Sequence, residues 1–213
     1  MQTTLSQLSA WISEARQRTL ELVADLDDDQ LIGPRLQIVN PLLWEIGHVA
    51  WFQEKWVLRR GGKPSIRADA DDLYDSAAVA HDTRWDSPLP GRNDTLRYMA
   101  SVLARVVERC RQDDPDDAYF VRLALFHEDM HDEAFTYTRQ TLGYAPPRLP
   151  VATDPTPPSD ESQGALPGDV SIPGGTFALG ALQSEPFVFD NEKWSHPVTI
   201  RPDRKSTRLN SSH

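Results

Sequence analysis

The sequence predicts a mainly α-helical protein, in which a four-helix bundle is followed by a short β-containing segment. Apolar residues recur at helical spacing in four stretches of residues 1–145. Seven prolines and almost no large apolar residue follow within residues 146–168, a composition typical of a linker. Residues 169–202 then alternate β-branched and aromatic runs with glycine and proline, as short strands and turns do. We therefore expect a bundle, a linker and a β-containing fragment, in that order.

The first two helices have recognisable ends. The first is expected over residues 4–26, until the acidic run at residues 27–29 breaks the apolar pattern. The second is expected to begin with Asn40 as its N-cap and Pro41 as its first helical residue. It should continue to the glycine pair that starts at Gly61.

A long crossover separates the two halves of the predicted bundle. Residues 63–91 show little periodicity, and a loop of this length inside a compact domain is usually functional. A third helix is expected over residues 93–112, and a fourth from Asp114-Pro115 to Gly143. Four helices with one long crossover are typical of a four-helix bundle.

The composition limits the possible partners. The net charge of −10 argues against a protein that wraps nucleic acid or lies on an anionic membrane. No apolar run approaches the roughly 20 residues that span a bilayer, and the N-terminus lacks the pattern of a secretory signal. The single cysteine, Cys110, excludes an intramolecular disulfide and a cysteine-based zinc cluster, and it falls on the inward face of the third helix. We expect a cytoplasmic protein that acts on small molecules.

The C-terminal residues have an unusual sequence. Residues 203–213 read DRKSTRLNSSH, which matches the in-frame translation of a common sequencing adapter at every position. We therefore expect an artefact tail without regular structure, in which Leu209 makes no core contacts. In that case residues 169–202 begin a truncated second domain, too short to bury a core. Its apolar residues should then be partly exposed, namely Phe177, Phe187, Phe189 and Trp194.

The strongest chemical signal is the pair of histidines in His127-Glu-Asp-Met-His131. Imidazoles at positions i and i+4 share one face of a helix and lie close enough to bind one metal. Small or apolar residues occupy the rest of that face. Both histidines should therefore point into the bundle, where neutral imidazoles are costly to bury without a partner. The acidic residues predicted on the opposite face are Asp129, Asp132 and Glu133.

His48 in the second helix is the third candidate ligand. Helical spacing places aromatic residues beside it, so it faces inward either as a hydrogen-bonded core residue or as a metal ligand. Metal sites in bundles are assembled from facing helices, and three histidines leave coordination positions open for zinc or iron chemistry. His81 is expected at the surface or beside the site. The tryptophans expected mainly in the core are Trp44, Trp51 and Trp56, with a cation–π cage for a quaternary ammonium group as an alternative role for one of them.

Two groups of motifs resemble one enzyme family. WEIGHVAWFQEKWVLR, followed by FHEDMHDEAF, resembles the iron-binding DinB-like bundle of the sulfoxide synthases that make ergothioneine, and of the related selenoneine synthases. IPGGTFALG and FVFDNEKWSHPV resemble the start of the second domain of these enzymes, which has the formylglycine-generating-enzyme fold, a C-type-lectin-like fold. HEDMHDEAFTYTRQTLGY and LYDSAAVAHDTRW are closer to the selenoneine branch.

This resemblance implies a ferrous ion on His48, His127 and His131, with dioxygen as co-substrate. It implies a reaction that joins a thiol, thiosugar or selenosugar donor to carbon 2 of the trimethylhistidine imidazole. Arg84 matches the arginine that binds the carboxylate of the donor, with a surface arginine as the alternative. Met130 stands where the sulfur branch has a glutamine that contacts trimethylhistidine. The catalytic tyrosine of the family lies in the part of the second domain that this chain lacks, so we expect little synthase activity.

Two other functions remain open. DinB-like bundles also include thiol transferases and hydrolases that bind zinc or nickel through three histidines, although such enzymes usually end after the bundle. A non-enzymatic metal-binding or interaction module is the other alternative, and it requires His48 to lie far from His127 and His131. The Asp190-Asn191-Glu192 segment is expected to form a structural turn.

Overall fold

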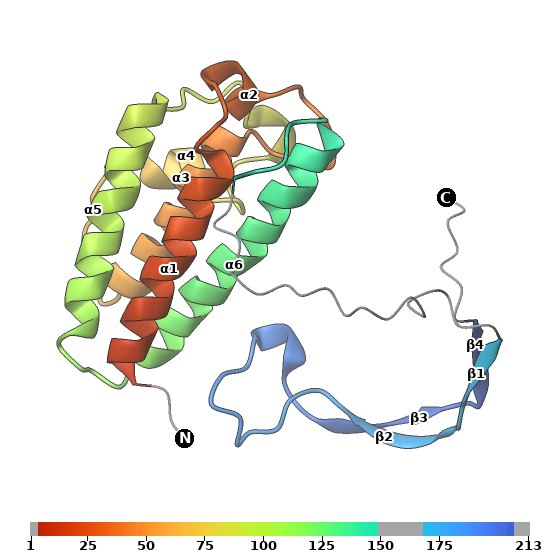
Figure 1. Ribbon diagram of the computed structural model, residues 1–213. Coiled ribbons are helices and arrows are strands. Elements are labelled where there is room, and N and C mark those ends of the chain that lie inside the picture. Colours follow the sequence, from red (N-terminus) through yellow and green to blue (C-terminus); the bar gives the residue numbers. More distant parts are fainter. Residues whose placement is uncertain (1–3, 149–167, 207–213) are drawn as a thin grey trace. The chain divides into compact units, whose positions relative to one another are not determined.

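The computed structural model describes residues 4–148 and 168–206, which fall into two units divided between Pro150 and Val151. The first unit is helical and the second contains the strands (Figure 1). In the described part of the first unit, four long helical segments form the predicted bundle: α1 (Leu5–Val23), α3 (Leu42–Gln53) continued by the π-helix η1 (Glu54–Leu58), α5 (Arg92–Cys110) and α6 (Asp117–Thr141). Shorter helices lie between them: α2 (Asp28–Ile32), α4 (Ala70–Tyr74) and the 3₁₀ helix η2 (His81–Thr83).

Capping residues determine where α1 and α2 begin. The Thr4 side chain accepts a hydrogen bond from the backbone N–H of Gln7, whose own side chain accepts one from the Thr4 N–H. Asp27 and Gln30 form the same capping box at the start of α2. The acidic run predicted to interrupt helical structure therefore starts a second short helix, because aspartate is a strong N-cap.

The predicted start of α3 is off by one residue. Pro41 is the N-cap and no side chain caps this end, because the Asn40 side-chain oxygen instead accepts a hydrogen bond from Arg84 at 2.6 Å. Helix α3 also does not continue regularly to the glycine pair, since it widens into η1 at Glu54 and ends at Leu58.

The start of α6 differs from the prediction as well. Asp116 is the N-cap, because the Asp114 carboxylate accepts from the backbone N–H of Asp116 and closes a turn ahead of the helix. Just past the end of α6, Gly143 has a φ of 68°, a conformation that glycine adopts without strain. The glycine stop was therefore predicted correctly, and the helix opening was not.

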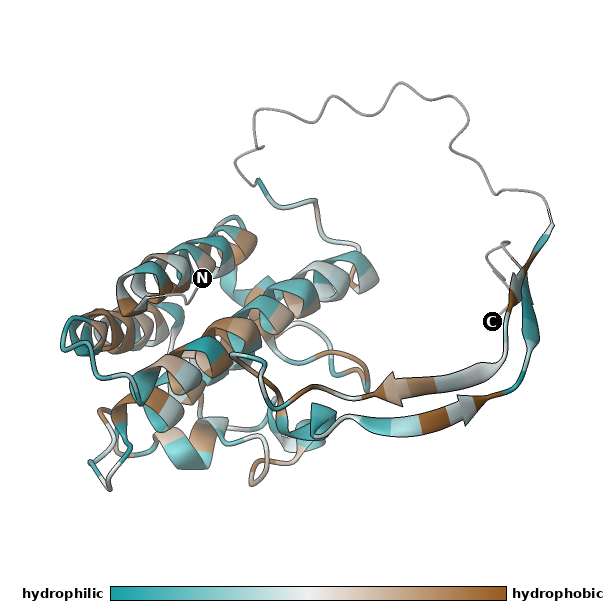
Figure 2. Cartoon of the chain, turned by 90° about the horizontal axis from the view of Figure 1, so that it is seen from below, coloured by the Kyte–Doolittle hydropathy of each residue, from teal (hydrophilic) through white to brown (hydrophobic). Residues whose placement is uncertain are grey.

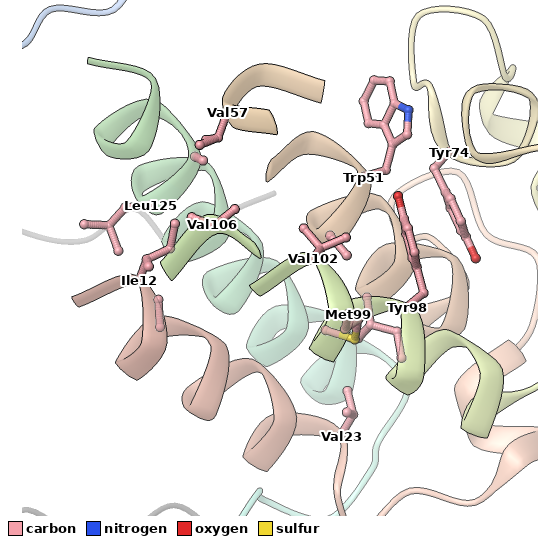
Figure 3. Packing of buried hydrophobic residues seen from close by; sticks show 14 of the residues in the cluster. Ile12, Val23, Trp51, Val57, Tyr74, Tyr98, Met99, Val102, Val106 and Leu125 are labelled. Carbon is pink, nitrogen blue, oxygen red and sulfur yellow. The ribbon is translucent and has the colours of Figure 1, made fainter. Parts of the chain in front are cut away.

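One apolar core joins the four helical segments. Figure 3 shows buried side chains from α1, α3, η1, α5 and α6 meeting between the helices. Figure 2 shows apolar and polar positions interspersed along these helices, and nearly every residue of α3 is buried whatever its polarity. Cys110 is buried in this core as predicted, and burial raises the pKa of its thiol to about 11. It is therefore an unreactive packed thiol.

A buried polar network connects α1 with α6. Arg16 donates to Glu128 at 2.7 Å, and the Thr19 hydroxyl lies 2.9 Å from the Glu128 carboxylate and 2.7 Å from that of Asp132. Gln53 also donates to Glu128. The prediction that Asp132 faces outward is wrong, because α1 covers this side of α6 and supplies polar partners there. Burial raises the pKa of Asp132 to about 7.

The second unit consists of two antiparallel strand pairs. β2 (Gly175–Leu179) pairs with β3 (His196–Ile200), and apolar positions are interspersed with polar ones along both strands (Figure 2). The 3₁₀ helix η3 (Asp190–Glu192) lies between them and forms the expected turn. Phe177 and Trp194 are exposed and Phe187 and Phe189 are half-buried, as predicted for this fragment.

The other strand pair corrects one prediction. β4 (Asp203–Ser206) pairs with β1 (Asp169–Ile172), so residues 203–206 have regular structure. Backbone N–H and C=O groups on an exposed strand can pair with an extended segment whatever its side chains are. Leu209 lies outside the described residues.

Within the described ranges, no helix combines the length and the apolar character that crossing a membrane would require.

Candidate metal centre

His48, His127 and His131 converge on one point. One ring nitrogen from each can be chosen so that all three lie within 4.8 Å of one another. The ring of His48 lies 5.0 Å from each of the other two, and these are 4.5 Å apart, measured between centroids. His48 lies in the middle of α3, whereas the other two are one turn apart on α6. The convergence that the spacing predicts is therefore present.

His48 is held in a stack of aromatic rings. Trp44 lies 4.7 Å away and nearly parallel, and Trp51 lies 5.5 Å away. The Nδ1 atom of His48 is 2.7 Å from the carbonyl oxygen of Tyr74, which can only accept, so Nδ1 carries the proton. Burial, with a smaller effect from His131, lowers the pKa of His48 to about 3. The ring is therefore neutral at pH 7, and Nε2 has the lone pair that a metal needs.

The short helix α4 accepts hydrogen bonds from the whole stack. The Trp51 indole donates to the Asp71 carboxylate at 2.7 Å, and the Trp44 indole donates to the Leu73 carbonyl at 2.6 Å. With the bond from His48 to Tyr74, three neighbouring ring N–H groups donate to acceptors within the five residues of α4. The crossover expected to lack regular structure therefore contains the element that orients His48.

Gly47 allows α4 to approach α3 this closely. A Cβ atom at this position would overlap the ring of Tyr74. Because Tyr74 is itself fully buried and stacked on Tyr98, its ring has little room to move. Glycine at this position is therefore a packing requirement for the His48–Tyr74 hydrogen bond.

The two histidines of α6 have different neighbours. His131 Nδ1 lies 2.8 Å from Glu45 Oε1, and Glu45 is buried on α3. The ring of His127 is stacked on Phe52 at 3.6 Å and almost parallel to it. Burial and the neighbouring imidazoles lower the pKa of His127 well below its usual value, so this ring is also neutral.

The residues present fit a divalent metal. His127 Nδ1 is buried and has no hydrogen-bond partner in the described part of the chain. Three imidazoles with facing nitrogen atoms and a buried carboxylate beside them form a donor set that a cation satisfies. Three histidines leave coordination positions open, which is compatible with zinc or iron.

Arg84 is buried near this centre. Only 8% of its surface is exposed, so the surface alternative is wrong. Its guanidinium donates to Asn40 and to the Val79 carbonyl, and it lies 3.9 Å from the ring centroid of Trp44. Its Nε atom has no hydrogen-bond partner among the described residues. Burial lowers the pKa of Arg84 from its ordinary value, against the opposing charge of Glu45.

The other residues singled out from the sequence differ in solvent exposure. Met130 is 52% exposed on α6. Trp44 and Trp51 are buried as predicted, but Trp56 is 40% exposed, because η1 turns it outward beside Phe120. His81 is half-buried, with its Nε2 atom 2.7 Å from the Val39 carbonyl oxygen.

Sequence reasoning missed Glu45. The signal was a carboxylate three residues before an inward-facing histidine, in a helix whose other residues are nearly all apolar. The Tyr74 carbonyl carries no side-chain signal, so sequence could not indicate it.

Comparisons with known proteins agree with this geometry. A family model described as the DinB superfamily matches residues 12–135, which include all three histidines. The chain is 34% identical to hercynine oxygenase of Mycolicibacterium smegmatis over 191 residues, which cover 87% of this chain and 44% of that protein. It is 31% identical to hercynine oxygenase of Mycolicibacterium thermoresistibile, over 92% of this chain and 44% of the relative. For the Mycobacterium tuberculosis protein of the same name the identity is 30%, over 93% and 47%.

The chain therefore spans less than half of the length of these curated relatives. The family match, in contrast, covers more than half of this chain and the complete candidate centre. On this evidence, the chain belongs to the DinB superfamily.

Proposed function

We propose that this chain is the metal-binding part of a non-haem iron, O2-dependent synthase that acts on hercynine, which is trimethylhistidine. The reaction joins a selenium or sulfur donor to carbon 2 of the hercynine imidazole. The observation that carries this proposal is the convergence of His48, His127 and His131 in a bundle. The relatives named hercynine oxygenase, which share the region of all three histidines, support the same substrate.

In this proposal the three histidines hold Fe(II) through ring nitrogens. The iron, when bound, supplies the one-electron chemistry by which dioxygen becomes reactive. The chain contributes an oriented donor set, since His48 is fixed by the carbonyl of Tyr74 and His131 by Glu45. Trp44 and Trp51 keep water away from the buried side of the site.

Two further residues are proposed to contact substrates. Arg84 binds the carboxylate of the donor through its Nε, which has no hydrogen-bond partner among the described residues. This requires the donor to reach the guanidinium group where it lies against the ring of Trp44. Met130 is exposed between the two histidines of α6 and contacts trimethylhistidine through apolar surface. Because HEDMHDEAFTYTRQTLGY and LYDSAAVAHDTRW resemble the selenoneine branch more closely, we favour that branch and a selenosugar donor.

We also propose that the strand-containing unit is the start of a formylglycine-generating-enzyme-like domain. The relatives are more than twice as long as the matched region, which leaves room for such a domain in them. The residues that would donate protons and hold the trimethylammonium group then belong to that domain. The 213-residue chain should bind iron, but without those residues it should turn over little substrate.

The test uses the full-length protein encoded by the natural gene. Oxygen consumption and product mass are measured after anaerobic Fe(II) loading, with hercynine and each of the three donor types. We expect consumption that requires both iron and hercynine, with the selenosugar preferred. His48→Ala should abolish it, whereas His81→Ala should not, because His81 lies outside the converging set. Zinc-dependent thiol transfer without oxygen consumption would instead support the thiol transferase alternative.

A second comparison separates metal binding from catalysis. The 213-residue chain and the full-length enzyme should bind Fe(II) similarly, and only the longer protein should form product. Equal turnover in both would show that the bundle alone holds the active site, which would contradict the proposed role of the second domain.

A further inference from the structure

We infer that Glu45 is a positioning residue that strengthens metal binding at His131 through the negative charge of its carboxylate. The inference rests on the proposed metal centre and adds to it a residue outside the three ligands. The supporting observations are the position and burial of the Glu45 carboxylate, and the fact that only one of its two oxygen atoms has a hydrogen-bond partner among the described residues.

The first oxygen fixes the orientation of His131. Glu45 Oε1 lies 2.8 Å from His131 Nδ1, and this contact joins α3 to α6. An ionised carboxylate only accepts, so the proton is on Nδ1 and the lone pair is on Nε2. The same carboxylate polarises the N–H bond and makes Nε2 a stronger donor to a cation.

The second oxygen of Glu45, Oε2, is buried and lacks a hydrogen-bond partner in the described residues. No lysine or arginine of residues 4–148 forms an ion pair with Glu45 there, although the field of Glu45 reaches Arg84. A buried carboxylate oxygen without a hydrogen-bond partner is costly. A divalent cation on the far side of the His131 ring supplies the missing positive charge.

Glu54 shows what a purely structural buried glutamate looks like in the same helical stretch. Its Oε1 accepts from the Ser65 hydroxyl and from the Ile66 N–H, both at 2.7 Å, and its Oε2 accepts from the Tyr98 hydroxyl at 2.6 Å. Both oxygens are therefore satisfied by protein groups. Glu45 differs in having one oxygen on a candidate ligand and the other unsatisfied, which marks it as functional.

The experiment compares Glu45→Gln with Glu54→Gln in the complete chain. Co(II) affinity and the visible absorption of the Co(II) complex are measured, and Fe(II) affinity is measured anaerobically by chelator competition. Glu45→Gln keeps the shape and an acceptor oxygen but removes the charge. We expect it to weaken Co(II) and Fe(II) binding by about 10- to 100-fold, the usual effect of losing an outer partner of a ligand, and to shift the absorption bands. Glu54→Gln should lower thermal stability and leave the spectrum unchanged.

Unchanged affinity and spectrum in Glu45→Gln, with metal bound by the wild-type chain, would overturn this inference and leave the proposed function intact. A wild-type chain that binds neither metal would overturn both. If Glu45→Gln does not fold, histidine-selective ¹⁵N NMR of the zinc-loaded wild type decides. A protonated Nδ1 on His131 supports the inference, and a metal-bound Nδ1 contradicts it.

Discussion

His48 and the two histidines of α6 meet in one centre, but their surroundings differ. His48 is buried, stacked between two tryptophans and bonded to a main-chain carbonyl. His127 and His131 are half-buried, and besides His48 each has one close partner on α3, namely Phe52 for His127 and Glu45 for His131. The α3 side of the centre is therefore part of the hydrophobic core, whereas the α6 side is partly exposed to solvent.

This difference indicates which of the three candidate ligands fixes the geometry of the site. A core residue that is fixed by packing on both faces cannot move without disturbing its neighbours. A half-buried residue held by one contact can adjust when a metal or substrate arrives. We therefore expect changes on the α3 side to affect both stability and metal binding, and changes on the α6 side to affect mainly metal binding.

Gly47→Ala should have the largest effect on stability and metal affinity, because Gly47 lies on the tightly packed α3 side. The added methyl overlaps the buried ring of Tyr74, and overpacking of this kind costs about 1–3 kcal/mol of unfolding free energy. Displacement of Tyr74 also weakens its bond to His48, so metal affinity should fall about 10-fold or more. Urea unfolding and Co(II) titration measure the two effects.

A double-mutant cycle is the control for this prediction. Gly47→Ala combined with Tyr74→Ala should cost less unfolding free energy than the sum of the two single variants, because the second change removes the overlapped ring. Additive costs would show that the close approach of α4 does not explain the need for glycine.

Phe52→Leu should have a smaller effect, because Phe52 lies on α3 at its boundary with α6 and contacts His127 of α6. The substitution removes the ring stacked on His127 but keeps an apolar side chain in its place. An aromatic pair contributes about 0.5–1.5 kcal/mol, so we expect metal affinity to fall by roughly 2- to 10-fold with little loss of stability. Trp56→Leu is the matched control, since Trp56 is exposed and lies one turn beyond Phe52. An equal loss of affinity in the control would argue against a specific role of the stacked ring.

The smallest expected effect concerns Asp71, which anchors Trp51 and Arg59. The Arg59 guanidinium, with help from the Trp51 indole, holds the pKa of Asp71 well below its usual range. Because this pKa is lower in the folded than in the unfolded chain, the ionised carboxylate stabilises the fold above about pH 4 and loses this effect as the pH falls further.

Asp71→Asn should therefore cost less than about 1 kcal/mol at neutral pH, because 43% of the Asp71 side chain is exposed. Urea unfolding of both proteins at pH 7 and near pH 3 checks this, and the difference between them should shrink in acid. A difference that grows as the pH falls would give the opposite sign and contradict the assigned pKa direction.

The bundle and the three histidines were predictable, because both depend on periodic patterns along single helices. The i, i+4 pair in α6 and the aromatic residues around His48 give the direction of each ligand. The assignment failed for Asp132, since a helix that packs on two sides buries polar residues that a one-sided pattern places in solvent. Arg16 and Thr19 on α1 are the partners that make this burial possible.

Three other features, namely α4, η1 and β4, depend on local contacts that leave no pattern in the sequence. Helix α4 is five residues long, which is too short to show a period, and it is stabilised by ring N–H groups from α3 instead of by its own sequence. The widening of α3 into η1 also has no sequence period of its own, and it is what exposes Trp56. Strand β4 depends on backbone pairing with β1, to which side chains contribute little.

The three ring N–H groups that donate to acceptors on α4 couple this short helix to the candidate metal centre. Opening α4 would break the bonds from Trp44, His48 and Trp51 together, so any ligand that immobilises His48 must disfavour that opening. Thermodynamic reciprocity then requires that, if metal binding strengthens the binding of a partner to α4 by some factor, that partner strengthens metal binding by the same factor. Deuterium uptake by the amides of Ala70–Tyr74 should therefore report metal occupancy from a site whose atoms touch no metal. In the same way, a substitution that opens α4 should lower metal affinity without touching any of the three histidines.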